Sequence, residues 1–303
     1  MKRRMIWGLL LGAIIIAGCG TARQVTKEAD FLESDGIFSY KVGQIEVYTL
    51  VEAQREGNAG ILAGVDEAFL SQYIPSAGFM HSTNVFLIKA HGQNILIDTG
   101  FGTTIFEKIK KLGVEPDQIN VVYLTHLHGD HIGGLQKDGV ALFPNAIIFV
   151  PTKDREYFEA QGNAGLAAAF APYPDNESCC AGLTNFEPAA LDESFPPAII
   201  SGITPIANYG HTPGHTVYLI ENNGEKLIIA GDFLHVALVQ FANPDISATF
   251  DVDPIAAAAS RRKLLNYATE HKIPIGGMHI VYPGIGTVEA AASGEGFTFT
   301  PVR

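Results

Sequence analysis

The sequence is poor in cysteine, in charged residues and especially in basic ones. It has three cysteines in 303 residues, and its 20 Lys and Arg face 32 Asp and Glu, for a formal net charge of −12. Two of the cysteines, Cys179 and Cys180, are adjacent, and adjacent cysteines rarely form a disulfide because the geometry is strained. An acidic surface repels phosphate backbones, so we expect no nucleic-acid partner.

A long membrane-spanning run is also missing. The apolar residues 6–17 follow the basic residues 2–4 and fall short of the roughly 20 needed to span a bilayer, which indicates an export signal. Residues 16–19, Ile-Ala-Gly-Cys, resemble a bacterial lipobox. We expect residues 1–18 to be a lipoprotein signal peptide, with a lipid on Cys19 holding the protein to the membrane of the cell envelope, facing the periplasm or the exterior. An ordinary secretory signal, which would release the protein, is the alternative.

The rest of the chain predicts one α+β domain. Residues 19–36 are polar and aperiodic and read as a tether, and residues 37–303 are assigned to the domain. Strand patterns recur in both halves, so two packed sheets with helices outside are expected. The expected strands are 45–51, 84–89, 94–97, 120–125, 146–150, 216–221, 226–230 and a last one towards Met278, with helices at 103–112, ended by Gly113, and 254–270.

The strongest chemical signal is a run of ligand-type side chains that directly follows the short apolar strand 120–125. His126, His128, Asp130 and His131 fall within six residues, although the whole chain has only 10 histidines. Alternation directs the first two the same way, while the following turn directs the other two at a neighbouring point. Four such ligands can serve two metal centres. The alternative is a solvated loop that happens to be rich in histidine.

Three later segments offer further ligands. His211 and His215 precede a strand, Asp232 ends another apolar strand, and His279 follows Met278. A buried carboxylate at a strand end is costly unless it is paired, and metal coordination removes that cost. A capping role for Asp232 and a core position for His279 are the alternatives for each residue taken singly. No cysteine belongs to this set, so the site is expected to use nitrogen and oxygen donors.

Together these motifs resemble the metallo-β-lactamase-fold hydrolase superfamily, and most of all its methyl parathion hydrolase-like and lactonase group. The resemblance covers residues 37–303 and implies a four-layer αββα sandwich in a single domain. It implies that His126, His128 and His211 bind one divalent ion, that Asp130, His131 and His279 bind a second, and that Asp232 bridges both. Asp98 matches the superfamily's structural aspartate, and His215 matches a position that is not a ligand. Zinc suits this set, and manganese, iron or cobalt can also occupy it.

The expected chemistry is hydrolysis of a small-molecule lactone, aryl ester or phosphotriester by a metal-bridging hydroxide. Asp130, Asp232 and His235 are the candidate catalytic side chains, with His235 near the leaving group or in a packing role. Residues 151–197 are read as an insertion over the site, where Tyr157 and Phe158 would line an apolar pocket. A glyoxalase II-like thioesterase and a non-catalytic metal-binding envelope lipoprotein are the alternatives. Relatives in this group are often dimers, so the resemblance also implies a homodimer as a possible assembly.

Overall fold

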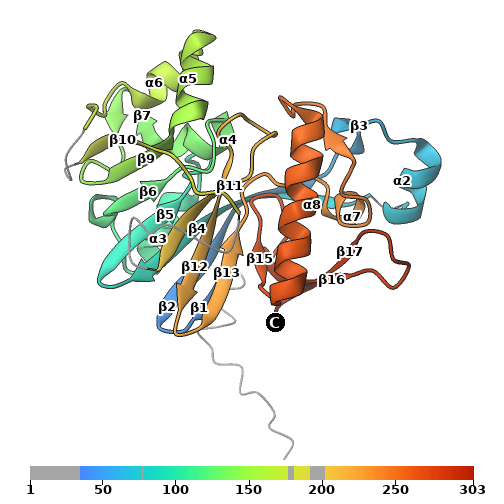
Figure 1. Ribbon diagram of the computed structural model, residues 1–303. Coiled ribbons are helices and arrows are strands. Elements are labelled where there is room, and N and C mark those ends of the chain that lie inside the picture. Colours follow the sequence, from blue (N-terminus) through green and yellow to red (C-terminus); the bar gives the residue numbers. More distant parts are fainter. Residues whose placement is uncertain (1–34, 77, 177–180, 192–201) are drawn as a thin grey trace, which may run out of the picture.

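The computed structural model describes residues 35–303 except 77, 177–180 and 192–201. The expected signal peptide, the lipid site Cys19, nearly all of the expected tether and the pair Cys179–Cys180 therefore lie outside the described residues. Within the described ranges, no helix has the length and apolar character needed to cross a membrane. Two mixed sheets with helices on their outer faces form the molecule (Figure 1).

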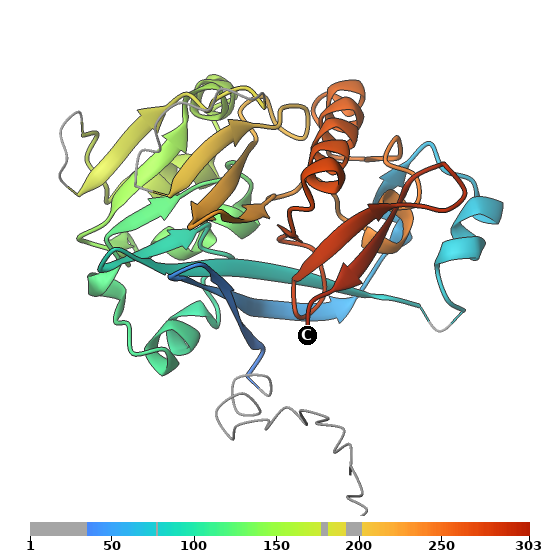
Figure 2. The same cartoon turned by 60° about the horizontal axis from the view of Figure 1, so that its bottom comes forward.

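The first sheet has seven strands in the order β1-β2-β4-β5-β6-β9-β10. Its members are β1 (Ile37–Val42), β2 (Ile45–Glu56), β4 (Met80–Ala90), β5 (Gln93–Ile97), β6 (Val121–Tyr123), β9 (Ile147–Pro151) and β10 (Gly182–Phe186). Pairing is antiparallel from β1 to β5 and parallel from β5 to β10. Figure 2 shows the long strands β2 and β4 reaching towards the C-terminal hairpin.

The second sheet has six strands in the order β11-β12-β13-β15-β16-β17. They are β11 (Ile203–Ala207), β12 (Thr216–Asn222), β13 (Glu225–Ile229), β15 (Ile275–Gly276), β16 (Ile285–Ala290) and β17 (Phe297–Pro301). The expected last strand towards Met278 is wrong in two respects: β15 has only two residues, and two more strands follow it. The chain turns after β15, where the N–H of Gly277 donates to the carbonyl of Gly284 at 3.1 Å.

The remaining elements are mostly short helices and two small ladders. The helices are α2 (Glu67–Tyr73), α3 (Ile105–Lys111), α4 (Gly129–Ile132), α5 (Thr152–Ala160), α6 (Ala164–Phe170), α7 (Ala237–Gln240) and α8 (Pro254–His271), with 3-10 turns at Ala59–Ile61, Pro116–Gln118 and Gly133–Leu135. The strand β3 (Leu62–Ala63) pairs with β14 (Ser247–Ala248), and β7 (Gln136–Lys137) pairs with β8 (Val140–Ala141). Part of the segment read as an insertion is thus an integral edge strand, β10, and the helices α5 and α6 precede it.

Buried apolar side chains fill the interface between the two sheets and the interface of each sheet with its outer helices. Phe86 and Ile88 of the first sheet belong to one buried cluster with Tyr218 and Ile220 of the second, which places the central core between the sheets. A second cluster joins the outer face of the first sheet to α3, α4, α5 and α6, and a third joins the outer face of the second sheet to α8. The predicted α+β αββα arrangement is confirmed.

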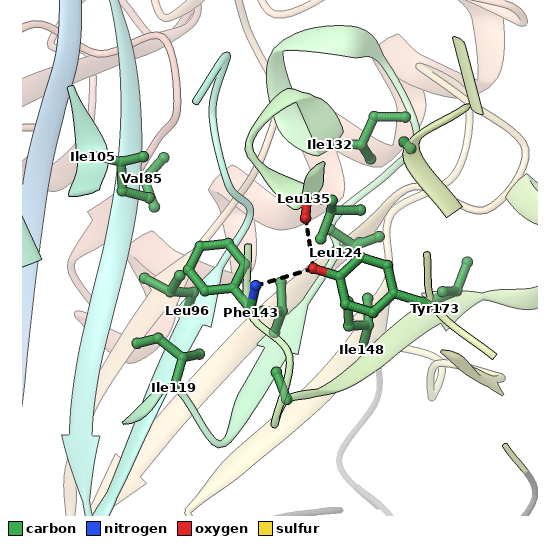
Figure 3. Packing of buried hydrophobic residues seen from close by; sticks show 14 of the residues in the cluster. Val85, Leu96, Ile105, Ile119, Leu124, Ile132, Leu135, Phe143, Ile148 and Tyr173 are labelled. Carbon is green, nitrogen blue, oxygen red and sulfur yellow. Dashed lines mark hydrogen bonds between the residues drawn. The ribbon is translucent and has the colours of Figure 1, made fainter. Parts of the chain in front are cut away.

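Figure 3 shows how the outer cluster accommodates a polar atom. The buried Tyr173 hydroxyl donates to the carbonyl of Leu135 and accepts from the N–H of Phe143 at 3.2 Å. Both bonds form inside the apolar cluster, so the buried hydroxyl has a partner as donor and as acceptor.

Local sequence signals fix several element ends. Gly113 takes φ +73° just after α3, as expected of a helix-ending glycine. The hairpin turn between β12 and β13 places Asn223 and Gly224 at φ +53° and +81°. At the start of α8, the Asp253 side chain accepts from the N–H groups of Ile255 and Ala256.

Candidate metal centre

Four segments converge at one edge of the two sheets. His126, His128, Asp130 and His131 follow β6, and α4 begins at Gly129, so the last two lie on its first turn. His211 precedes β12, Asp232 follows β13 and His279 follows β15. In the described part of the chain, all seven side chains predicted as ligands fall into two groups whose donor atoms lie within 4.8 Å of one another.

The first group consists of His126, His128, His211 and Asp232. Nδ1 of His128 lies 3.0 Å from Nε2 of His126 and 3.0 Å from Nε2 of His211, and the two Nε2 atoms are 3.2 Å apart. Oδ2 of Asp232 is 3.6 Å from Nε2 of His126 and 3.5 Å from Nε2 of His211. Three imidazole nitrogens and one carboxylate oxygen thus point at a single small space, as a tetrahedral ion requires.

The second group consists of Asp130, His131, Asp232 and His279. Nε2 of His131 lies 3.7 Å from Oδ1 of Asp130 and 3.3 Å from Oδ1 of Asp232. Nε2 of His279 lies 3.7 Å from Oδ2 of Asp130 and 3.0 Å from Oδ2 of Asp232. Nε2 of His131 and Oδ1 of Asp232 are both buried and neither has a hydrogen-bond partner. A cation between them would satisfy both atoms.

Hydrogen bonds on the far side of three rings fix which nitrogen faces the groups. Nδ1–H of His131 donates to Oδ2 of Asp98 at 2.6 Å, and Nδ1–H of His279 donates to the carbonyl of Ser82 at 2.8 Å. Nδ1–H of His211 donates to Oδ1 of Asp251 at 2.8 Å. Each Nε2 therefore faces its group and is the nitrogen that can give a lone pair to an ion there, the arrangement that tunes metal-binding histidines.

His126 is oriented through a hydroxyl. Thr125 donates its hydroxyl proton to Oδ2 of Asp98 at 2.7 Å, so the oxygen is left to accept from Nδ1–H of His126 at 3.0 Å. The N–H of Thr125 also donates to Oδ1 of Asp98 at 2.7 Å. Asp98, at φ +61° after β5, thus orients a ring in each group.

The electrostatics favour neutral imidazoles beside ionised carboxylates in the first group. Burial, with His131 nearby, holds the pKa of His126 well below its usual value, and burial lowers the pKa of His211 to about 3. The pKa of Asp232 lies well below its usual range despite burial, because His131, His279 and His126 surround it. In the second group, Asp232, Asp98 and Asp130 outweigh burial and raise the pKa of His131 well above its usual value. The two groups therefore offer nitrogen and oxygen donors that fit divalent metal ions.

The two other histidines beside Asp232 differ in their bonding. Nδ1–H of His215 donates to the carbonyl of Asn208 at 3.0 Å, and Nε2 of His215 accepts from the N–H of Asp232 at 3.0 Å. Nε2 of His235 lies 3.1 Å from Oδ2 of Asp232, while its buried Nδ1 has no hydrogen-bond partner. Both ring nitrogens of His215 are engaged within the protein, whereas His235 keeps one free.

Three residues around the two metal-binding groups were not predicted from the sequence. The buried Asp154 accepts from the N–H groups of Leu127 and Gly214 and from the hydroxyl of Thr212 at 2.9 Å, and so joins the two histidine loops. The ring of His81 stacks on that of His279 with centroids 4.5 Å apart. Asp251, described above, was missed as well. None of the three lies at a motif spacing from the ligands, so only the fold reveals them.

An apolar cavity of about 270 Å³ opens beside the first group. Its lining includes His128, Ile132, Phe158, Leu166 and Ala169. The Phe158 ring meets that of His128 edge-on with centroids 5.7 Å apart. Tyr157, which the sequence suggested for the same pocket, is instead half-buried against the outer cluster of the first sheet.

Comparison with known proteins agrees with this geometry. A family model described as "Metallo-beta-lactamase superfamily" matches residues 79–271. Among solved structures, the hydrolase AbOPH is 26% identical with a TM-score of 0.77, and AidC, a dizinc quorum-quenching lactonase, is 25% identical with a TM-score of 0.74. Each alignment covers 88% of this chain and 98% of the other.

The curated relatives match only locally. Ribonuclease Z of Clostridioides difficile is 50% identical over 48 residues, which is 16% of this chain and 15% of that protein. Ribonuclease Z of Agathobacter rectalis is 42% identical over 64 residues, 20% of each protein. The family model covers well over half of the chain and the fold and site agree with it: the chain belongs to the metallo-β-lactamase superfamily and is a metal-dependent hydrolase.

Proposed function

We propose that the protein is an exported, dinuclear metal hydrolase that opens lactones, and that aryl esters and phosphotriesters are its secondary substrates. The observation that carries this proposal is the shared carboxylate: Asp232 belongs to both groups. A carboxylate common to two ligand sets holds two ions side by side, the arrangement of two-metal hydrolytic sites. The similarity to AidC over 88% of the chain supports the lactone.

Two bound ions would supply a hydroxide nucleophile at neutral pH and a Lewis acid for the oxygen that gains charge. Zinc is the proposed metal, with manganese, iron and cobalt as substitutes. The three histidines of the first group and Asp130, His131 and His279 of the second are the proposed ligands, and Asp232 is the proposed bridge. The bonds of Asp98 hold one ring of each group in place, so both can be loaded with little rearrangement.

The proposed proton transfers use Asp232 and His235. Nε2–H of His235 donates to Oδ2 of Asp232, and burial lowers the pKa of His235, so the ring is neutral and holds its proton at Nε2. Asp232 can accept a proton from the attacking water oxygen and pass it to the leaving oxygen, while the Nε2–H of His235 orients the carboxylate near the leaving group by its hydrogen bond. Asp130 is the third proposed catalytic residue. It is half-buried at the edge of the second group, and its carboxylate supplies negative charge there.

The apolar surroundings favour a substrate with a hydrocarbon part. Phe158 closes one side of the first group. Phe250, which is 41% exposed, meets the His235 ring edge-on with centroids 4.6 Å apart on another side. An acyl or aryl group between these rings would leave the ester carbon facing the metal groups. The formal net charge of −12 supports a neutral substrate over RNA.

A metal assay combined with a substrate panel tests the proposal. We expect about two ions per chain after purification, and chelator-sensitive hydrolysis of an acyl-homoserine lactone in preference to dihydrocoumarin, a p-nitrophenyl ester and a phosphotriester. Less than one tightly held ion, together with no chelator-sensitive hydrolysis, would support the non-catalytic lipoprotein instead. Turnover of a thioester or a penicillin alone would contradict the lactonase and phosphotriesterase readings together.

Export is a separate part of the proposal, and it rests on residues 1–19 of the sequence. Intact-mass measurement of the protein from bacterial membranes should give a chain that begins at Cys19 with added acyl groups. A soluble chain without that mass, released into the medium, would favour the ordinary secretory signal.

A further inference from the structure

A buried arginine lies beneath the loop that carries the shared carboxylate. Arg261, in the middle of α8, is 1% exposed, and a guanidinium is among the most costly groups to remove from water. Residues 233–251, which run from just after Asp232 to Asp251, wrap around it. This segment therefore encloses a charged group as well as its own buried apolar side chains, among them Phe233, Val239 and Phe241.

The guanidinium binds the loop at four points. Nε–H donates to the carbonyl of Phe233, and one terminal nitrogen donates to the carbonyls of Pro244 and Ile246, the latter at 2.8 Å. The other terminal nitrogen lies 3.8 Å from Oδ2 of Asp251. The planar fork of arginine can reach all of these acceptors at once, whereas the single ammonium of lysine cannot.

Two of these four points lead directly to the first group. Phe233 is the residue after Asp232. Asp251 receives Nδ1–H of His211 on Oδ1 at 2.8 Å, and the N–H of Ala248 on Oδ2 at 2.8 Å. One side chain thus holds the backbone beside the shared carboxylate and the partner that orients the His211 ring.

We propose that Arg261 is a positioning residue for the first group, acting through Asp251 on His211 and through Phe233 on Asp232. The inference rests on the proposed function, since it assumes that this group binds an ion. Without the guanidinium, three loop carbonyls and one carboxylate lose buried donors. The loop then relaxes towards water, and the first group loses its fixed spacing. The second group shares Asp232 but takes Asp130, His131 and His279 from other segments, so its geometry changes less.

The test measures metal affinity rather than activity. Stepwise zinc or cobalt affinities are determined by chelator competition for the wild type and for Arg261→Met. His128→Ala and His279→Ala identify which step belongs to which group. We expect Arg261→Met to weaken the first-group step by about 10–100-fold, the usual effect of losing a partner behind a ligand. The second-group step, which shares only Asp232 with the affected segment, should weaken much less.

Arg262→Met is the matched control. Arg262 is the next residue on α8 and pairs with Asp245 of the same loop at 2.8 Å, but its side chain is 43% exposed. An exposed ion pair contributes little, so both steps should match those of the wild type. Asp251→Asn should reproduce the selective loss, and combining it with Arg261→Met should add less than the two single losses together.

The outcomes separate the possible failures. If wild type and Arg261→Met bind both ions with equal affinity, the role of Arg261 is wrong while the proposed function stands. If the wild type binds no ion, the proposed function itself fails. If Arg261→Met does not fold, Arg261→Lys and Asp251→Asn decide: a selective loss of the first step in them supports the proposal, and wild-type affinities contradict it.

Discussion

Nε2 of His215 accepts a hydrogen bond from the backbone N–H of Asp232 at 3.0 Å, so a histidine inside a ligand-rich motif acts on the backbone of its neighbour. Its other nitrogen is bound to the carbonyl of Asn208. The ring is buried completely, and burial lowers its pKa to about 4, which keeps it neutral near pH 7. The same residue type, a few positions apart in sequence, therefore serves different purposes at His211 and His215.

Replacing His215 by leucine should weaken both groups without removing a ligand. The N–H of Asp232 and the carbonyl of Asn208 would lose their partner, and the unfolding free energy should fall by about 2–3 kcal/mol. Metal content at saturating zinc should still reach two ions per chain, while activity falls about 10–100-fold. Denaturant unfolding and metal analysis check this, and a permanent loss of one ion would make His215 a ligand after all.

Replacing Asp232 by alanine should have a larger effect of a different kind. Both groups lose an oxygen donor, so activity should fall by more than the roughly 100-fold expected for a residue behind a ligand. Metal analysis should give fewer than two ions per chain. His215→Leu serves as the comparison, because it disturbs the same residue and spares its carboxylate. Two tightly held ions in Asp232→Ala would contradict the shared carboxylate.

Asp154 joins the two histidine loops, and its raised pKa predicts a free energy of unfolding that depends on pH. Burial raises the pKa of this carboxyl to about 6 from its ordinary value of 3.8, so the folded chain holds the proton more tightly than the unfolded chain. The contribution of this group to stability is therefore full below pH 4 and is lost as pH rises towards 6 and above. The stability of the wild type relative to Asp154→Asn should be about 1 kcal/mol greater at pH 5 than at pH 7. Urea unfolding at both pH values measures it, and an equal difference at the two would contradict the shift.

The aromatic walls predict a change in substrate preference. Phe158→Ala and Phe250→Ala each remove an apolar surface beside the first group, so KM for a long-chain acyl-homoserine lactone should rise about 10-fold, with a smaller change for a short-chain one. Val140→Ala, at a side chain that is 64% exposed, is the control. Equal effects on both chain lengths would argue that the rings only support the ligands.

The ligand segments could be predicted from sequence because each is short and local. The run from His126 to His131 follows a strand, and strand ends meet at a sheet edge. The hairpin at Asn223 and Gly224 and the helix α8 were likewise encoded by neighbouring residues.

The partners behind the ligands could not be predicted. Asp251 lies 40 residues from His211, and Asp154 lies 27 and 60 residues from two of its donors, Leu127 and Gly214. Such pairings depend on how helices and loops pack, which no local pattern specifies. The strands β16 and β17 were also missed. Alternation is weak in β16, which reads Ile-Gly-Thr-Val-Glu-Ala with a glycine where a side chain would mark the buried face, whereas β17 alternates Phe and Thr over only four residues before Pro301.

The ligands come from both sheets, His126 from the end of the first and Asp232 from the end of the second. Ions held between them would link the two sheets at the edge where the ligand loops lie. A chain deprived of metal would then open first at this edge, exposing its loops to proteases while the interior stays closed. The working lifetime of the enzyme would consequently depend on the supply of the metal ion in its surroundings.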